Sequence, residues 1–167
     1  MDYQEYIRLL KIQINSQSYK QQLEFAVMIC KKMYLEYQNF VGVYKWGDAN
    51  LLMDAIKICD NSKDNYVDIN QVKELIPTID LIIPDMDDFG GSEIGSYALN
   101  ASVSVYETLE FIIDQDKSHI FNIATYYTDT IDFKIQEEKE LTEMEIDNHP
   151  LMIEAWKYII DLTKNGA

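Results

Sequence analysis

Residues 23–48, LEFAVMICKKMYLEYQNFVGVYKWGD, decide the fold that we expect of this chain. Apolar side chains recur here at the i, i+3, i+4, i+7 spacing of one helical face. They are Leu23, Ala26, Val27, Cys30, Met33, Tyr34, Tyr37, Phe40 and Val41. Phe25, Met28 and Ile29 add apolar side chains on other faces, which is typical of a helix inside a bundle. The stretch therefore predicts a central buried helix that begins after Ser18 and ends at about residues 40–44.

Shorter helices are predicted around this one from capping residues and apolar spacing. Asp48 is expected to cap the next helix, and Pro77 is expected to kink or break a later one because proline lacks an amide hydrogen. No stretch shows the alternating pattern of a strand. We therefore expect one all-α domain over residues 1–167, an antiparallel bundle of six to seven helices around a central buried helix.

The charge of the chain restricts its partners. There are 14 Lys and Arg residues against 29 Asp and Glu residues, for a net charge of −15. A field of this sign repels phosphate backbones and anionic lipids, so we expect neither nucleic acid nor membrane as a partner. It attracts a basic protein or a divalent cation. The alternative interpretation is that the surplus acid keeps the protein in solution.

Several features favour the cytoplasm. Cys30 and Cys59 lie in apolar helical stretches, where a free thiol behaves as a small buried hydrophobe. Their spacing makes neither a disulfide framework nor a zinc site. The first ten residues, MDYQEYIRLL, lack the order of a signal peptide, and no apolar run reaches the ~20 residues of a membrane span.

The central stretch resembles the YjaG-like family of small bacterial proteins. The resemblance begins with Cys30-x-x-Met33-Tyr34-x-x-Tyr37-x-x-Phe40 and Gly47-Asp48. It continues in order with Leu75-Ile76-Pro77, Asp88-Phe89, Gly95-x-Tyr97, Asn148-His-Pro150 and Trp156. The sequence has Ala98 and Asn100 where the family usually has a proline and an acidic residue. The resemblance implies an all-helical domain of unknown function and supplies no catalytic residue.

One loop has the partial pattern of a calcium site. Asp60, Ser62, Asp64 and Asp68 occupy the first, third, fifth and ninth positions of a calcium-binding loop between two predicted helices. The twelfth position normally holds a bidentate glutamate, but here it is Gln71. We favour the alternative of an ordinary capped loop between helices and expect no cofactor.

A second acidic group precedes the fifth predicted helix. The loop contains a Gly-Gly pair and the carboxylates of Asp85, Asp87, Asp88 and Glu93, which could hold a metal or a basic ligand. In an enzyme or a metal protein, this group would act together with His149. The alternative is that Asp87 or Asp88 only caps a turn.

Aromatic residues near helix ends suggest a binding surface. Tyr44, Trp46 and Tyr66 would form a protein-binding patch if they gathered beside the acidic residues. The alternative is that the three rings lie apart and each covers a different part of one hydrophobic core.

No nucleophile motif, phosphate loop or dinucleotide fingerprint occurs in the chain. We therefore expect a non-enzymatic protein-binding module, in one version an immunity-type protein that neutralises a basic toxin. One alternative is a metal-binding protein or enzyme that uses the Asp85–Glu93 loop. Another is a homodimer that buries exposed apolar residues such as Leu35, Ile58 and Phe133.

Overall fold

The computed structural model describes residues 1–137 and 139–165. Within these ranges the secondary structure consists of eight α-helices and one 3-10 helix, with no strand, so the predicted all-α bundle is confirmed. The elements are α1 (Tyr3–Ser16), α2 (Tyr19–Tyr44), α3 (Ala49–Asn61), α4 (Ile69–Asp80), η1 (Met86–Phe89), α5 (Glu93–Asp114), α6 (Lys117–Gln136), α7 (Glu143–Asp147) and α8 (Pro150–Asn165).

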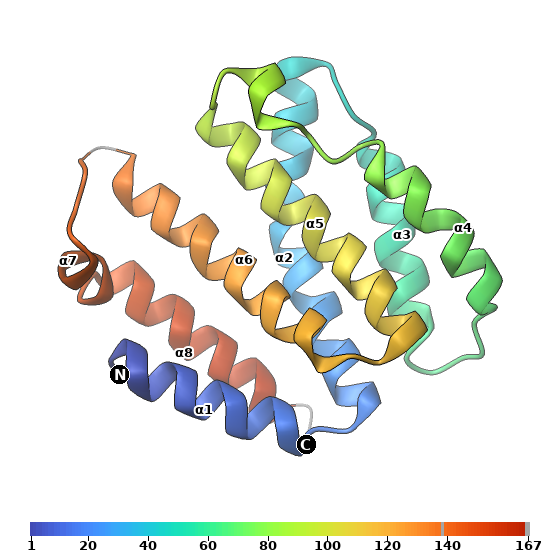
Figure 1. Ribbon diagram of the computed structural model, residues 1–167, viewed down its shortest axis with the longest axis horizontal. Coiled ribbons are helices and arrows are strands. Elements are labelled where there is room, and N and C mark those ends of the chain that lie inside the picture. The colour runs from blue at the N-terminus through green and yellow to red at the C-terminus, as the bar shows by residue number, and fades with distance from the viewer. Residues whose placement is uncertain (138, 166–167) are drawn as a thin grey trace.

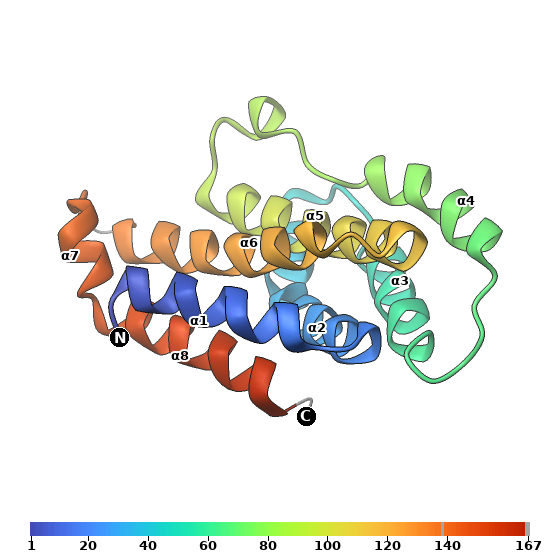
Figure 2. The same cartoon turned by 60° about the horizontal axis from the view of Figure 1, so that its bottom comes forward.

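Two helices share the centre of the molecule. The predicted buried helix is α2, which contacts α3, α5, α6 and α8. Its partner α5 contacts α2, α3, α4 and α6. Figure 1 shows α2 and α5 in the middle, with α1, α6 and α8 on one side and α3 and α4 on the other. In the turned view of Figure 2, α1, α6 and α8 again lie side by side.

Capping residues set where α2 begins and where α3 begins. The Ser18 hydroxyl accepts a hydrogen bond from the Gln21 amide, and the Gln21 side chain accepts one from the Ser18 amide. This capping box satisfies two otherwise unpaired donors. Asp48 likewise accepts from the Leu51 amide at 2.9 Å, as the sequence predicts.

Small residues on α5 let it pack closely against α2. Ala101, Ser102 and Ser104 are all buried. The Ser104 and Thr108 hydroxyls each donate to a carbonyl four residues earlier in α5, at 2.7 Å, so these polar groups are satisfied inside the core. Thr108 also lies 3.3 Å from the Cys30 sulfur of α2.

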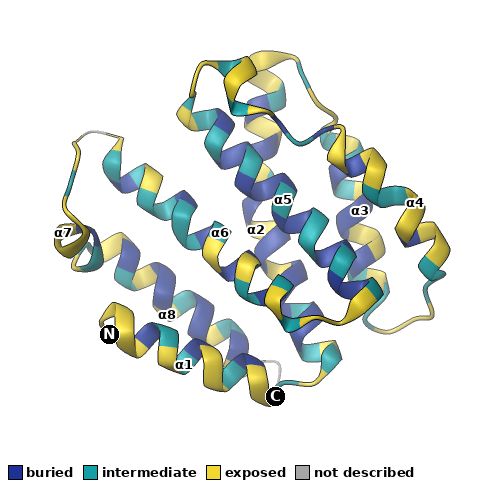
Figure 3. Ribbon diagram, viewed as in Figure 1, coloured by how far each residue is buried: buried dark blue, intermediate teal, exposed yellow. Residues whose placement is uncertain are grey.

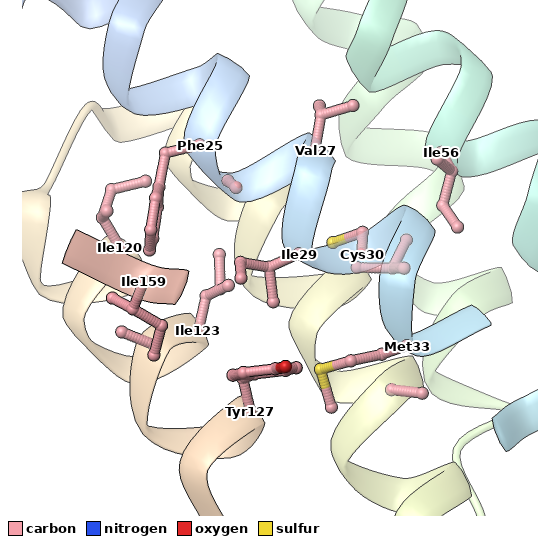
Figure 4. Packing of buried hydrophobic residues seen from close by; sticks show 14 of the residues in the cluster. Phe25, Val27, Ile29, Cys30, Met33, Ile56, Ile120, Ile123, Tyr127 and Ile159 are labelled. Atoms are coloured by element: carbon pink, nitrogen blue, oxygen red, sulfur yellow. The ribbon is translucent and has the colours of Figure 1, made fainter. Parts of the chain in front are cut away.

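The rest of the core surrounds α2 on several sides. Figure 4 shows Phe25 of α2 beside Ile120 of α6 and Ile159 of α8. On another side of the helix, Cys30 lies toward Ile56 of α3. The buried apolar residues of the described chain other than Tyr97 form one cluster. The short helices are therefore held in place by contacts with the rest of the core more than by their own propensity.

Two segments differ from the sequence-based expectation. The sequence predicts a kink or a break at Pro77; α4 continues through Pro77 to Asp80, so a break is wrong and a kink stays a prediction. Because Pro77 has no amide hydrogen, the Lys73 carbonyl lacks its usual helical donor. Both residues are exposed, so water can donate a hydrogen bond to this carbonyl instead. The acidic stretch after α6 contains the extra short helix α7, which begins at a capping box between Thr142 and Glu145.

Tyr37 of α2 joins three parts of the chain. Its hydroxyl donates to the Ile82 carbonyl at 2.7 Å and accepts from the Asp48 amide at 3.3 Å. Gly47 lies directly against it with φ +87°, and a Cβ at this glycine would be 2.5 Å from the Tyr37 hydroxyl. Both the backbone conformation and the lack of space therefore require glycine at this position.

His119 joins α5 and α6 near their connecting turn. Its Nδ1 contacts Glu107, and its Nε2 lies 3.0 Å from Asp114 Oδ2. Glu107 also accepts hydrogen bonds from Asn122 and Tyr126 of α6. Burial lowers the pKa of His119, but the hydrogen bonds and charges of Glu107 and Asp114 outweigh this effect and raise the pKa above its ordinary value of 6.5.

We expect Gly47→Ala to lower the free energy of unfolding by at least about 2 kcal/mol in urea denaturation. Alanine is strained at the positive φ of this position, and its Cβ would clash with the Tyr37 hydroxyl. Gly90→Ala is the matched control, because Gly90 has φ +63° and no heavy atom within 4 Å of an added Cβ. It should cost about 1 kcal/mol. Tyr37→Phe removes the clashing hydroxyl, so Gly47→Ala should cost less in that background. Equal costs for the two glycine substitutions would contradict this account.

The stability that His119 supplies should fall as the pH rises. The folded protein binds the second imidazole proton of His119 more tightly than the unfolded chain does. The stabilisation from protonated His119 is therefore complete below pH 6.5, the ordinary pKa of histidine, and is lost as the pH rises through the higher pKa of the folded state. We expect His119→Gln to cost about 1–2 kcal/mol at about pH 6 and progressively less above it, in urea denaturation. Glu107→Gln should flatten the pH dependence of the wild-type chain. A His119→Gln cost that stays constant up to about pH 9 would rule out this role.

Candidate functional site

The four residues of the predicted calcium loop have separate partners. The Asp60 carboxylate lies 2.6 Å from the ammonium groups of both Lys31 and Lys63. Asp64 pairs with Lys20. These pairs lower the pKa values of Asp60 and Asp64, with the lysine hydrogen bonds as the largest cause. The loop thus uses these carboxylates to tie α2 to the end of α3.

The other two residues of this loop act locally. Ser62 donates to the Cys59 carbonyl at 2.7 Å, and Asp68 caps α4 by accepting from the Asn70 amide at 2.9 Å. Among the described residues, no group of three or more His, Cys, Asp or Glu side chains is arranged to hold a metal ion. The ordinary capped loop stays the interpretation that we favour, and titration with Ca²⁺ by calorimetry is the test of the calcium alternative.

The Asp85–Glu93 loop connects α4 to α5. Asp85 caps η1 by accepting from the Asp87 amide at 3.0 Å. Asp87, Asp88 and Glu93 are exposed, and Figure 3 shows most of this loop at the surface. In the described part of the chain, none of these four carboxylates has a lysine, arginine or histidine within ion-pair distance. His149 lies elsewhere, before α8, where its ring accepts from the Leu151 amide.

An aromatic cluster lies against this acidic loop. The ring of Phe89 is 4.9 Å from that of buried Phe40, 5.2 Å from Tyr44 and 5.3 Å from Trp46, measured between centroids. Tyr44 is 37% exposed, and Trp46 and Phe89 are half-buried. Two of the three predicted patch residues, Tyr44 and Trp46, therefore contact the same ring. That ring is Phe89, which belongs to the acidic loop.

Tyr66 is not part of that cluster. It is 92% exposed and lies on the connection between α3 and α4. There it lines a separate open cavity of about 460 Å³ together with Ile58 and Leu75. The structure thus separates Tyr66 from Tyr44 and Trp46.

A third acidic region, which sequence reasoning missed, is a groove of about 300 Å³ where α1, α6, α7 and α8 meet. Figures 1 and 2 show α7 beside the start of α1, the end of α6 and the start of α8. The carboxylates lining the groove are Asp129, Asp132, Glu143 and Asp147. Burial, followed by the charge of Asp132, raises the pKa of Asp129. Burial also raises the pKa of Asp147, followed by the charges of neighbouring carboxylates.

Aromatic rings form the other wall of this groove. Trp156 stacks on Tyr6 with centroids 5.4 Å apart and an interplanar angle of 14°. Tyr3 lies 6.0 Å from Trp156 in a tilted arrangement. One local signal could have indicated this site, because Asp129 and Asp132 are three residues apart and so share a face of α6. The meeting of that face with Tyr3 and Trp156 is a tertiary contact that no local pattern encodes.

The two thiols offer no nucleophile. Cys30 and Cys59 are both free and buried, as expected. Burial raises the pKa of Cys30 to about 12, against a smaller opposite effect of the Thr108 hydrogen bond. A thiol with this pKa is protonated at neutral pH and is a poor nucleophile. None of the described helices combines the length and apolar character needed to cross a membrane.

The comparisons with known proteins concern family and fold. No curated protein matches the chain in sequence. A crystal structure of a DUF416 family protein from Shewanella baltica OS155 superposes with a TM-score of 0.79, at 20% identity over 92% of this chain and 82% of the other. This likeness supports the fold alone. The profile of the family described as "Protein of unknown function (DUF416)" matches residues 10–165, and the chain therefore belongs to the DUF416 family.

Proposed function

We propose that this protein is a non-enzymatic module that binds a basic protein partner through the α4–α5 loop and its adjoining rings. The observation that carries the proposal is the convergence of Tyr44 and Trp46 on Phe89, inside the loop that bears Asp85, Asp87 and Asp88. Partly exposed aromatic rings supply the anchors of protein interfaces. Carboxylates at the rim supply the steering for a partner of opposite charge.

The net charge of −15 is consistent with such a partner. An immunity-type pairing with a basic toxin is one form of this proposal, and the cytoplasm is the compartment that we expect. The YjaG-like name is compatible with membership of the DUF416 family. A metal-dependent or enzymatic role for the Asp85–Glu93 loop, and a homodimer, stay alternative predictions. Leu35, Ile58 and Phe133 are 66%, 40% and 41% exposed, and light scattering would detect a dimer that buries them.

The test is affinity capture from an extract of the source organism with the immobilised protein. We expect a basic protein to be retained at about 50 mM salt and released at about 300 mM, because rim charges are screened at the higher ionic strength. The triple variant Asp85→Asn/Asp87→Asn/Asp88→Asn should weaken the purified pair about tenfold or more. Asparagine is as good a cap as aspartate, so the variant at position 85 should keep η1 in place.

A charge-matched control separates a local site from the general field. Asp54→Asn/Glu74→Gln/Asp161→Asn removes the same three charges from exposed positions on α3, α4 and α8. It should weaken the pair less than about twofold. If no basic protein is retained at low salt, or if the control weakens the pair as much as the loop variant, the proposal is wrong.

A further inference from the structure

The outer side of α2 carries exposed apolar side chains. In Figure 1, α5 and α6 lie in front of α2, and this side is turned away from them. Met28 and Leu35 are both exposed here, although most apolar residues of α2 are buried. Residues seven apart lie within about 20° of one another around an α-helix, so Met28, Leu35 and Gly42 form one line. We call these three residues the outer row.

Neighbouring helices border the outer row without covering it. On one side, Lys31 forms an ion pair with Asp60 of α3 at 2.6 Å. On the other side, the Lys32 ammonium lies over the Tyr158 ring of α8, 4.3 Å from its centroid. Leu35 stays 66% exposed between these contacts, so another helix can reach α2 between α3 and α8.

Gly42 is the least expected member of the outer row. Glycine inside a helix is less favourable than alanine, because it loses more backbone freedom on folding. Gly42 does not end the helix, since α2 continues to Tyr44 and Lys45 takes the left-handed position that favours glycine, with φ +54°. Packing within the described chain does not require it either, because an added Cβ would have no heavy atom within 4 Å. A glycine in this place fits the close approach of a helix from outside the chain.

The outer row complements a copy of itself. Met28 comes seven residues before Leu35, and Gly42 comes seven residues after it. In an antiparallel pair of α2 helices that cross at Leu35 at a shallow angle, Met28 of each chain therefore lies opposite Gly42 of the other. The flexible methionine side chain fills the space above the glycine, and the symmetry repeats this contact. A two-fold interface requires a face that matches itself in this way.

The charges along α2 allow two acidic chains to meet here. The net charge of −15 makes two copies repel each other in general. Residues 25–44 contain a single carboxylate, that of Glu36, and it forms an ion pair with Lys134. Contact through the outer row therefore brings no unpaired carboxylates of α2 together at its centre.

The ends of this contact carry opposite charges. Glu24 comes eleven residues before Leu35, and Lys45 comes ten residues after it, so an antiparallel pair places each near the other. Glu24 makes only a long contact of 4.0 Å with Lys63, and Lys45 forms no ion pair with a described residue. A parallel pair would instead bring like charges together, so the charges favour the antiparallel direction.

We propose that this protein forms a two-fold symmetric dimer in which the outer rows of two α2 helices pack antiparallel about Leu35. The occupant of the outer row is thus a second copy of this chain. The dimer goes beyond the proposed function and does not depend on it. Tyr44 comes nine residues after Leu35, or about two and a half helical turns, so it lies on the opposite side of α2. The aromatic cluster of the α4–α5 loop therefore stays free in the dimer.

The first test measures the mass of the full chain by sedimentation equilibrium. A contact centred on one helix pair is at the small end of interface sizes, so we expect a dissociation constant of about 1–100 µM. Leu35→Glu places two carboxylates together at the crossing point and should weaken the dimer about a hundredfold. Leu81→Glu is the matched control, because it introduces the same charge at an exposed leucine directly after α4. It should change the dissociation constant less than about threefold.

A second variant separates the dimer from the fold. Gly42→Ala should raise the melting temperature of the dilute monomer, because alanine is the better helix residue and has room at this position. The same substitution should weaken the dimer about tenfold, because its methyl group meets Met28 of the second copy. A loss of dimer together with a gain in stability cannot come from damage to the fold.

Introduced cysteines test the direction of the pair. Cys30 and Cys59 are buried, so a short bismaleimide should react with introduced surface cysteines only. Leu35→Cys should be linked to itself in the dimer. Met28→Cys and Gly42→Cys should each give little linked dimer alone, but an equimolar mixture of the two should give it in high yield. In a parallel pair, each variant would be linked to itself instead.

Three results would overturn the proposal. A chain that stays monomeric up to about 500 µM leaves the outer row to solvent or to a different protein. A dimer that Leu35→Glu leaves intact uses another face, and self-linking of Met28→Cys without the mixed product means a different register. The triple variant of Asp85, Asp87 and Asp88 should form the dimer like the wild-type chain. Failure of the dimer and failure of the α4–α5 loop proposal are therefore distinguishable.

Discussion

The close packing of α2 against α5 is the contact on which the other helices depend. The buried surface of α5 carries small side chains at Ala101, Ser102 and Ser104, so the two helix backbones can approach closely. The Ser102 and Ser104 hydroxyls donate hydrogen bonds to carbonyls of their own helix. Polar groups satisfied in this way can be buried at little cost, whereas larger side chains would push the two helices apart. Every peripheral helix of the described chain then packs on this pair or on the α6 and α8 layer beside it.

This arrangement leaves the ends of helices and their connections as the places where function can reside. The buried faces of α2 and α5 are filled by packing, and the thiols of Cys30 in α2 and Cys59 in α3 are buried as well. The features without a structural explanation lie at the periphery, in the α4–α5 loop with its aromatic cluster and in the groove beside α7. Binding residues commonly sit on connections that a rigid scaffold holds in place.

The distribution of charge distinguishes the acidic regions from one another. With 14 basic residues against 29 acidic ones, many carboxylates cannot be paired inside the chain. The carboxylates of Asp60 and Asp64 form ion pairs with Lys20, Lys31 and Lys63. These pairs join α2 to the end of α3, which is a structural role. The groove carboxylates form no ion pair with a lysine, arginine or histidine of the described residues, and burial raises the pKa values of Asp129 and Asp147, so their charges are unfavourable in the folded chain. Unfavourable charges of this kind are often kept for binding at the expense of stability.

Local sequence patterns were enough to predict the helical class, the position of the central helix and most caps, because these depend on residue spacing and on hydrogen bonds within a few residues. Ser18, Asp48 and Asp68 act as caps for that reason. Packing between helices accounts for the course of α4 through Pro77 and for the contacts of Phe89 with Tyr44 and Trp46 but not Tyr66. It also places Asp129 and Trp156 in the lining of one groove. These outcomes depend on which helix faces meet and on which groups stay in contact with water. Contacts between residues far apart in the chain form only when the helices pack, so local spacing does not encode them.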